Sequence, residues 1–272
     1  MNQRKVHYAQ IFNIIKPSNL EVPINADSKA QHLTEEVKKR AVGYGFDLVG
    51  IVSPADLDAV PSFWIGHRDY RAYTKKTIDY MADVKSVIIL GARVWDDVFD
   101  FMIKVRDHYE YPEEWRGRLY ARRILRFLQR QGYSAILEDD WLLSKKRMAQ
   151  LAGFGNFGKN TLIINPSFGP WFRLRSVLTN AVLVPDKPFT EDLCGACEDC
   201  VKACPVDALT PYKLDPDKCL LGLTWAQRES PEYKELWRRH SPKLTPNTYV
   251  MCNTCQKACR HGRELRGLRP TN

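Results

Sequence analysis

Residues 194–205 read CGACEDCVKACP, and this stretch decides the fold of the last third of the chain. Its four cysteines follow the spacing C-x2-C-x2-C-x3-C and precede a proline, which is typical of bacterial ferredoxins that carry two clusters. Four more cysteines follow, at Cys219, Cys252, Cys255 and Cys259. None of the eight cysteines precedes residue 194. The pattern predicts two [4Fe-4S] clusters and one-electron chemistry.

The same ferredoxin pattern predicts which cysteines share a cluster, because the fourth cysteine of such a run ligates the other cluster. Cluster one then takes Cys194, Cys197, Cys200 and Cys259, and cluster two takes Cys204, Cys219, Cys252 and Cys255. The chain departs from the short ferredoxin form by a long insertion between Cys219 and Cys252, and by Arg260 where a proline is usual. Zinc favours paired C-x2-4-C motifs over such a triplet, and disulfides need an oxidising compartment.

Length and composition are those of an ordinary globular chain. Its 272 residues, 44% hydrophobic and 27% charged, suffice for one large domain and a small appended one. No apolar run approaches the ~20 residues of a membrane span, and no export signal is visible, so we expect a cytoplasmic protein without a membrane partner. The net charge of +9 favours an anionic partner such as nucleic acid, an acidic electron donor or a phosphate-bearing cofactor, and is equally compatible with a basic surface that has no nucleic-acid role.

Hydrophobic periodicity predicts an α+β fold. Helices are expected over residues 28–44, 69–81, 112–131 and 141–151, and strands over 46–52, 86–90, 133–137, 162–164 and 177–184. In the helix over 112–131, Leu119, Ile124, Leu125 and Leu128 are expected to face inward. The predicted organisation is an N-terminal arm (1–28), an α/β-like domain (29–188) and a two-cluster ferredoxin-like module (189–272).

A glycine block, AGFGNFGKNT, occupies residues 152–161. It contains a literal G-x-G-x-x-G and nearly a phosphate-binding P-loop, but a helical pattern precedes it where both motifs need a strand. Asn160 also stands where the P-loop needs Ser or Thr. These points disfavour nucleotide binding. A glycine turn that ends a helix is the structural alternative, and three glycines so close together indicate that something approaches this backbone.

Five blocks carry a resemblance to a known family. They are AGFGNFGKNTLIINPSFGPWFRLRSVLTN (152–180), PDKP (185–188), CGACEDCVKACPVDAL (194–209), CLLGLT (219–224) and MCNTCQKAC (251–259). Their order and spacing resemble those of the cobalamin-dependent epoxyqueuosine reductases and the related reductive dehalogenases. The resemblance covers roughly residues 35–261. It implies a nitroreductase-like corrinoid-binding domain over 29–188, with base-off cobalamin beside one cluster.

The resemblance also implies which residues contact cobalamin. They are Gly153, Gly155, Gly158, Lys159, Asn160, Thr161, Phe168, Gly169, Trp171, Leu221 and Thr224, with Asn165 on the same wall. Phe168 and Trp171 are equally compatible with an ordinary core. Leu221 replaces a serine that the family usually has.

An acidic segment supplies the candidate catalytic residue. The family's proton-donating aspartate aligns with Asp139, although its neighbour Asp140 differs by only one position and Leu142 replaces a family proline. The alternative is that Asp139 or Asp140 caps a helix that begins near residue 141. Both interpretations remain open at this point.

The resemblance implies a cytoplasmic corrinoid iron–sulfur reductase that converts epoxyqueuosine in tRNA to queuosine, or reduces a related electrophile. Its expected partners are a ferredoxin- or flavodoxin-type electron donor and tRNA. The six arginines of residues 116–130 are candidates for phosphate contacts, or form a solvated face. The family's helical-repeat extension does not follow the last cysteine within these 272 residues, and no twin-arginine leader is present. The alternative function is a ferredoxin-like protein that reduces a partner's corrinoid, and a weaker one is tRNA binding without catalysis.

Overall fold

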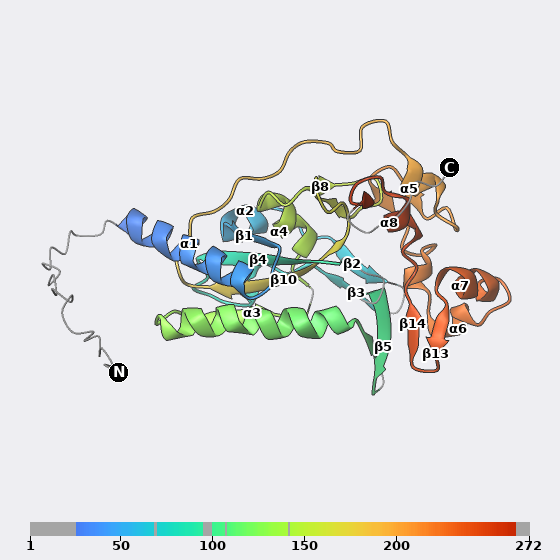
Figure 1. Ribbon diagram of the computed structural model, residues 1–272, viewed down its shortest axis with the longest axis horizontal. Helices are drawn as coiled ribbons and strands as arrows, with labels where there is room; N and C mark the ends of the chain where they lie inside the picture. Colours follow the sequence, from blue (N-terminus) through green and yellow to red (C-terminus); the bar gives the residue numbers. More distant parts are fainter. Residues whose placement is uncertain (1–25, 68–69, 95–99, 107, 141, 265–272) are drawn as a thin grey trace, which may run out of the picture.

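A four-stranded antiparallel sheet with helices on both faces forms the body of the molecule (Figure 1). The computed structural model describes residues 26–67, 70–94, 100–106, 108–140 and 142–264. The sheet has the order β1 (Leu48–Val52), β4 (Ser86–Arg93), β10 (Phe172–Thr179) and β7 (Ala135–Glu138). Helices α1 (Ala26–Gly43) and α3 (Pro112–Arg130) pack on one face, and α2 (Pro54–Asp58) and α4 (Lys145–Leu151) on the other.

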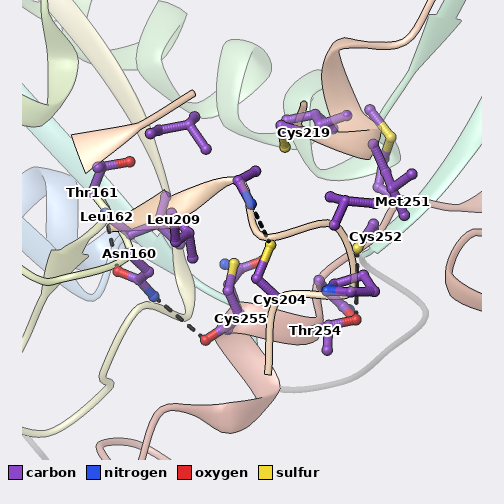
Figure 2. Close-up of a pocket in the computed structure, with 18 of the residues that line it drawn as sticks. Asn160, Thr161, Leu162, Cys204, Leu209, Cys219, Met251, Cys252, Thr254 and Cys255 are labelled. Carbon is purple, nitrogen blue, oxygen red and sulfur yellow. Dashed lines mark hydrogen bonds between the residues drawn. The ribbon is translucent and has the colours of Figure 1, made fainter. Parts of the chain in front are cut away.

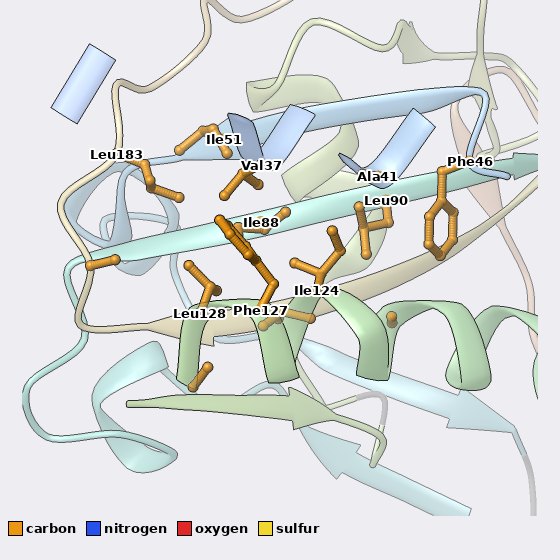
Figure 3. Close-up of a cluster of buried hydrophobic side chains, with 14 of the residues drawn as sticks. Val37, Ala41, Phe46, Ile51, Ile88, Leu90, Ile124, Phe127, Leu128 and Leu183 are labelled. Carbon is orange, nitrogen blue, oxygen red and sulfur yellow. The ribbon is translucent and has the colours of Figure 1, made fainter. Parts of the chain in front are cut away.

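Apolar side chains of β4 point alternately to the two faces of the sheet, and helices cover both faces. Ile88 and Leu90 point into the core beneath α1 and α3, where Figure 3 shows them beside Ile124. Val87 and Ile89 point into the opposite core beneath α2 and α4. Successive strand residues face opposite sides, so a strand that is apolar at every position must be buried on both faces.

A second sheet joins two distant parts of the chain. Its order is β13 (Lys243–Thr245), β14 (Thr248–Val250), β5 (Phe101–Val105) and β6 (His108–Glu110). Strand β14 pairs antiparallel with β5. A small core of Met102, Leu220, Leu223, Trp237 and Tyr249 covers it. Part of the α/β-like region thus shares one sheet with the cysteine-rich region.

The remaining elements are short. They are β2 (Trp64–His67), β3 (Tyr70–Tyr73), η1 (Thr77–Asp79), β8 (Asn156–Phe157), β9 (Ile163–Ile164), α5 (Asp199–Lys202), β11 (Leu209–Thr210), β12 (Lys213–Leu214), η3 (Leu220–Gly222), α6 (Trp225–Arg228), α7 (Lys234–His240) and α8 (Thr254–Ala258).

The mixed helix-and-strand fold is confirmed, and some local expectations are wrong. The helix expected over 69–81 is instead strand β3, which pairs with β2, followed by the short η1. Asp58, which lies outside this segment, accepts hydrogen bonds from both the backbone N–H and the hydroxyl of Thr77. These bonds hold the segment in its observed conformation. Leu119, expected to face inward, is 53% exposed. The expected arm lies almost wholly outside the described residues.

Candidate iron–sulfur and cofactor site

The eight cysteines line two separate cavities. Cys204, Cys219, Cys252 and Cys255 line a cavity of about 190 Å³, shown in Figure 2. Cys194, Cys197, Cys200 and Cys259 line a second cavity of about 20 Å³. Helices α5 and α8, each adjoining cysteines of both sets, pack against each other and bring the two runs together.

Burial sets the acidity of the thiols in these cavities. It raises the pKa of Cys255 to about 12 and that of Cys259 to about 11, and neighbouring thiols add to the effect. Iron binds the thiolate, so a bound cation must displace protons that these groups would otherwise keep at neutral pH.

The larger cavity is lined from both regions of the chain. Lys146 of α4 and the segment Asn160–Leu162 contribute from the α/β-like region. Asn160 is only 4% exposed; its Oδ1 accepts from Leu162 N (3.1 Å) and its Nδ2 donates to Cys255 O (3.5 Å). This amide therefore connects the glycine block to a cysteine of the cavity.

Thr161 adopts an unusual backbone conformation at the cavity wall. Its φ of 62° lies in the left-handed region, which a β-branched residue rarely occupies. Its carbonyl oxygen accepts from Lys146 Nζ (3.0 Å). The Lys146 side chain is exposed overall, and desolvation by the surrounding protein lowers the pKa of its ammonium group. Such strain persists where surrounding contacts over-determine it, most often at functional sites.

A buried polar cluster that the sequence analysis missed completes the wall. Asp100 accepts from Arg173 (3.0 Å) and from Asn253 (3.2 Å), and Arg173 stacks over the ring of Tyr111 at 4.3 Å. Burial raises the pKa of Tyr111 to about 12. Arg173 and Asn253 lie 73 and 153 residues after Asp100 in the sequence, so no local sequence pattern links the three residues. The one available signal was Arg173, one of two arginines in strand β10.

The three glycines of the block are explained by the protein's own packing. A Cβ on Gly155 would lie 2.1 Å from Ile164 O, one on Gly158 would lie 2.5 Å from Ile164 Cγ1, and one on Gly153 would lie 2.9 Å from Lys187 O. None of the three lines the larger cavity. Helix α4 precedes the block, so the strand that dinucleotide-binding and P-loop motifs require is not there.

The other predicted cofactor contacts occupy different positions. Trp171 is 1% exposed, Phe168 packs against the core beneath α4, and a Cβ on Gly169 would lie 2.0 Å from His261 O. Asn165 is buried and donates to Phe154 O (2.6 Å). Thus, of the predicted contacts, the larger cavity is lined by Asn160, Thr161 and Leu221.

Lys159 and Thr224 each have another role in the structure. Lys159 lines the smaller cavity and lies 3.7 Å from Glu198. Thr224 is the N-cap of α6: its hydroxyl accepts from Gln227 N, and Gln227 Oε1 accepts from Thr224 N.

The acidic segment at the end of β7 places its carboxylates in different environments. Glu138 is buried, pairs with Lys145 and accepts from Ser176 Oγ (2.8 Å). Asp140 accepts from Tyr80 Oη (2.5 Å) and Leu142 N (3.1 Å). Burial alone would raise the pKa of Asp140, but these hydrogen bonds outweigh it and hold the pKa below its usual value.

Asp139 is exposed and makes no hydrogen bond or ion pair with any residue that the structure describes. Helix α4 begins at Lys145, and its N-cap is Ser144, whose Oγ accepts from Arg147 N. The expectation that Asp139 or Asp140 caps this helix is therefore wrong. Asp139 is not among the residues that line the larger cavity.

Comparison with known proteins assigns the cysteine-rich region. Residues 193–262 match the family model of the 4Fe-4S double cluster binding domain. The chain is 38% identical over 126 residues to an epoxyqueuosine reductase of Listeria monocytogenes, a match to 46% of this chain and 31% of that protein. It is 29% identical over 252 residues to that of Prochlorococcus marinus, covering 84% of this chain and 77% of the relative. The chain is thus similar in sequence to epoxyqueuosine reductases. These relatives are oxidoreductases.

Solved structures show the same fold. An epoxyqueuosine reductase solved with an epoxyqueuosine-modified tRNA stem loop superposes with a TM-score of 0.64 at 20% identity, covering 91% of this chain and 68% of that one. A catabolic reductive dehalogenase gives 0.57 at 18% identity, covering 88% of this chain and 34% of that one. No helix in the described ranges is both long and apolar enough to cross a membrane.

Proposed function

We propose that the chain is a cobalamin- and [4Fe-4S]-dependent reductase that acts on epoxyqueuosine in tRNA or on a related electrophile. The observation that carries this proposal is the larger cavity, in which four cysteines share one space with Lys146, Asn160, Thr161 and Arg173 of the α/β-like region. The cluster that Cys204, Cys219, Cys252 and Cys255 would hold, the inner cluster, then lies against side chains of the α/β-like region, where a second cofactor can approach it.

The wall fits a corrinoid in chemistry. A corrin ring has apolar faces and amide side chains, and the wall combines leucine and methionine side chains with ammonium, amide, hydroxyl and guanidinium groups. The enclosed 190 Å³ is below the ~300–1,000 Å³ of typical organic-ligand pockets. The four cysteines line this cavity, so it includes the space of the inner cluster itself, and the cobalamin proposal is supported by the other side chains of the wall and by the similar proteins.

The chain's own residues have distinct roles in this proposal. Cys204, Cys219, Cys252 and Cys255 hold the inner cluster, and Cys194, Cys197, Cys200 and Cys259 hold the outer one. When bound, the clusters and the corrinoid supply one-electron transfer and reduction of the electrophilic carbon. Asn160 fixes the glycine block to Cys255 O, and the buried Asp100 holds the partly buried guanidinium of Arg173 at the wall. An external ferredoxin- or flavodoxin-type protein delivers the electrons.

Asp139 is the proposed proton donor. Asp140 is held ionised by its hydrogen bonds with Tyr80 and Leu142. The carboxylate oxygens of Asp139, in contrast, make no hydrogen bond or ion pair with any described residue. In one solved structure, that of the epoxyqueuosine reductase of Bacillus subtilis, the catalytic aspartate loop is swung out of the active site. An exposed Asp139 at the end of β7 is compatible with a loop of that kind.

A specific observation also favours the second candidate, a ferredoxin-like protein that reduces a partner's corrinoid. Asp139 does not line the cavity, and electron transfer requires no proton donor there. The two candidates differ in cobalt content.

The deciding experiment is anaerobic purification with cobalamin supplied, followed by iron and cobalt counts and an EPR spectrum. Eight irons, four for each cysteine set, and one cobalt per chain support the reductase, and conversion of epoxyqueuosine in tRNA then identifies the substrate. The same iron content without cobalt supports the electron-transfer protein and excludes the reductase proposal.

A further inference from the structure

The exposed face of α3 carries an uninterrupted stripe of five residues with a distinct composition. Trp115, Leu119, Arg122, Arg126 and Arg130 recur every three or four positions, so they lie on one face of the helix. All five are exposed, and the opposite face packs on β10 and β7. We call these residues the α3 stripe.

Acidic residues neutralise the beginning of α3 but not its end. Glu113 pairs with Arg116 (2.7 Å), Glu110 with Arg118 (2.8 Å), and Glu114 with Arg175 (3.8 Å). Every carboxylate near the first turns of the helix thus already has a cationic partner.

No acidic side chain in the described part of the chain pairs with Arg122, Arg126 or Arg130. Arg130 lies eight positions after Arg122, which is about 12 Å along the helix axis. Three unneutralised guanidinium groups in a row favour a polyanion, because each arginine can bind a phosphate through two hydrogen bonds.

The stripe also leads away from the proposed site. Tyr111, the residue that precedes α3, lines the larger cavity. Trp115 follows one turn later and is 42% exposed, so its ring can stack on an unpaired base. From Tyr111 to Arg130 the helix covers about 28 Å. An RNA that places one nucleotide at the cavity can therefore lay its phosphates along the arginines.

We infer that the α3 stripe is an RNA-docking surface, with Arg122, Arg126 and Arg130 on backbone phosphates and Trp115 against a base near the cavity. This inference rests on the proposed function for its substrate class. Single-stranded loops with splayed bases next to a paired stem suit this order of aromatic and basic residues. An acidic electron-donor protein is the competing occupant, and the test distinguishes it.

The test measures binding of a labelled, unmodified tRNA by fluorescence anisotropy at several salt concentrations. The variant Arg122→Gln/Arg126→Gln/Arg130→Gln is compared with Lys234→Gln/Arg238→Gln/Arg239→Gln on α7, which removes the same charge from another exposed helix. We expect the α3 variant to bind at least about tenfold more weakly, and its slope of log affinity against log salt to flatten by about 2, while the α7 variant stays near wild type. Trp115→Ala should weaken binding without changing the slope.

Three results overturn the inference: no tRNA binding by the wild-type protein, equal loss in both charge variants, or loss in neither. In a fourth such result, the α3 variant keeps its tRNA affinity, but an acidic ferredoxin reduces its clusters more slowly. That result assigns the α3 stripe to binding of the electron donor. Unchanged iron content and circular dichroism show that each variant folds. Binding needs no turnover, so a wild-type protein that binds tRNA through α3 but lacks cobalt contradicts the proposed reductase and leaves the docking surface standing.

Discussion

At the scale of single residues, the structure separates Asp139 from Asp140. Asp140 is tied to Tyr80, Leu142 and Lys75. Asp139 has none of these contacts and follows directly on the buried Glu138, whose pairing with Lys145 fixes the end of β7. Asp139 therefore lies at a fixed strand end and has no described partner for its carboxylate, which suits a residue that donates a proton.

Asp139→Asn should therefore lower the rate of epoxide reduction by about 10²–10⁴-fold, the usual contribution of a general acid. Iron and cobalt contents should stay at the wild-type level, since Asp139 has no described structural partner. Single-turnover reduction of epoxyqueuosine tRNA measures the rate. Asp140→Asn is the matched control: a larger loss there than at Asp139 would contradict the assignment of the acid.

His240 gives the stability of the cysteine-rich region a pH dependence. Burial, aided by the charge of Arg239, lowers its pKa below the ordinary 6.5, and its Nδ1 lies 3.2 Å from Thr254 Oγ1. The unfolded chain then binds a proton at a higher pH than the folded protein, so the contribution of His240 is complete above pH 6.5 and is lost as the pH falls below it. The melting temperature should fall between pH 7.5 and 5.5, and less so in His240→Gln. Identical falls in both proteins exclude this role for His240.

At the scale of elements, the glycine block acts as a packing device between α4 and the hairpin of β8 and β9. Gly155→Ala should destabilise the α/β-like region by about 1–3 kcal/mol, because the added methyl group meets the backbone oxygen of Ile164 and neither can move cheaply. Gly43→Ala, where nothing lies within 4 Å, should be neutral or slightly stabilising. Denaturant unfolding measures both changes. A Gly155→Ala protein of wild-type stability with reduced cobalamin binding would instead assign this glycine to the cofactor.

The elements that could be predicted from the sequence are those whose conformation is determined by their own residues and near neighbours in the chain. The period of residues 112–130 predicts α3 nearly to the residue, and the unbroken apolar run of β4 predicts a buried strand. The helix predicted over residues 69–81 is wrong because contacts outside this segment determine its conformation. Asp58 binds Thr77, and β2 pairs with β3. The Asp100–Arg173–Asn253 cluster was missed for the same reason. The cysteine spacing predicts a two-cluster module, but spacing holds no information about the wall that faces it.

At the scale of the whole molecule, the sheet of β13, β14, β5 and β6 makes the cysteine-rich region part of one structure with the α/β-like region. Removing iron with a chelator should unfold the surroundings of the cysteines, since metal binding and folding are coupled there. We expect amide hydrogen exchange to accelerate together in residues 101–110 and 243–250, while β4 and β10 stay protected. Acceleration confined to 243–250 would show that β5 and β6 hold their structure without β14.

The pairing of β5 with β14 also has a consequence for synthesis of the chain. β5 leaves the ribosome with only β6 available to pair, and roughly ten to thirty seconds pass before β14 follows at ordinary elongation rates. During that interval one edge of β5, including the apolar Met102, has no strand beside it, and an open edge invites pairing with other chains. A nascent chain of this protein should therefore depend on chaperones more than its size suggests, and most strongly when iron is scarce.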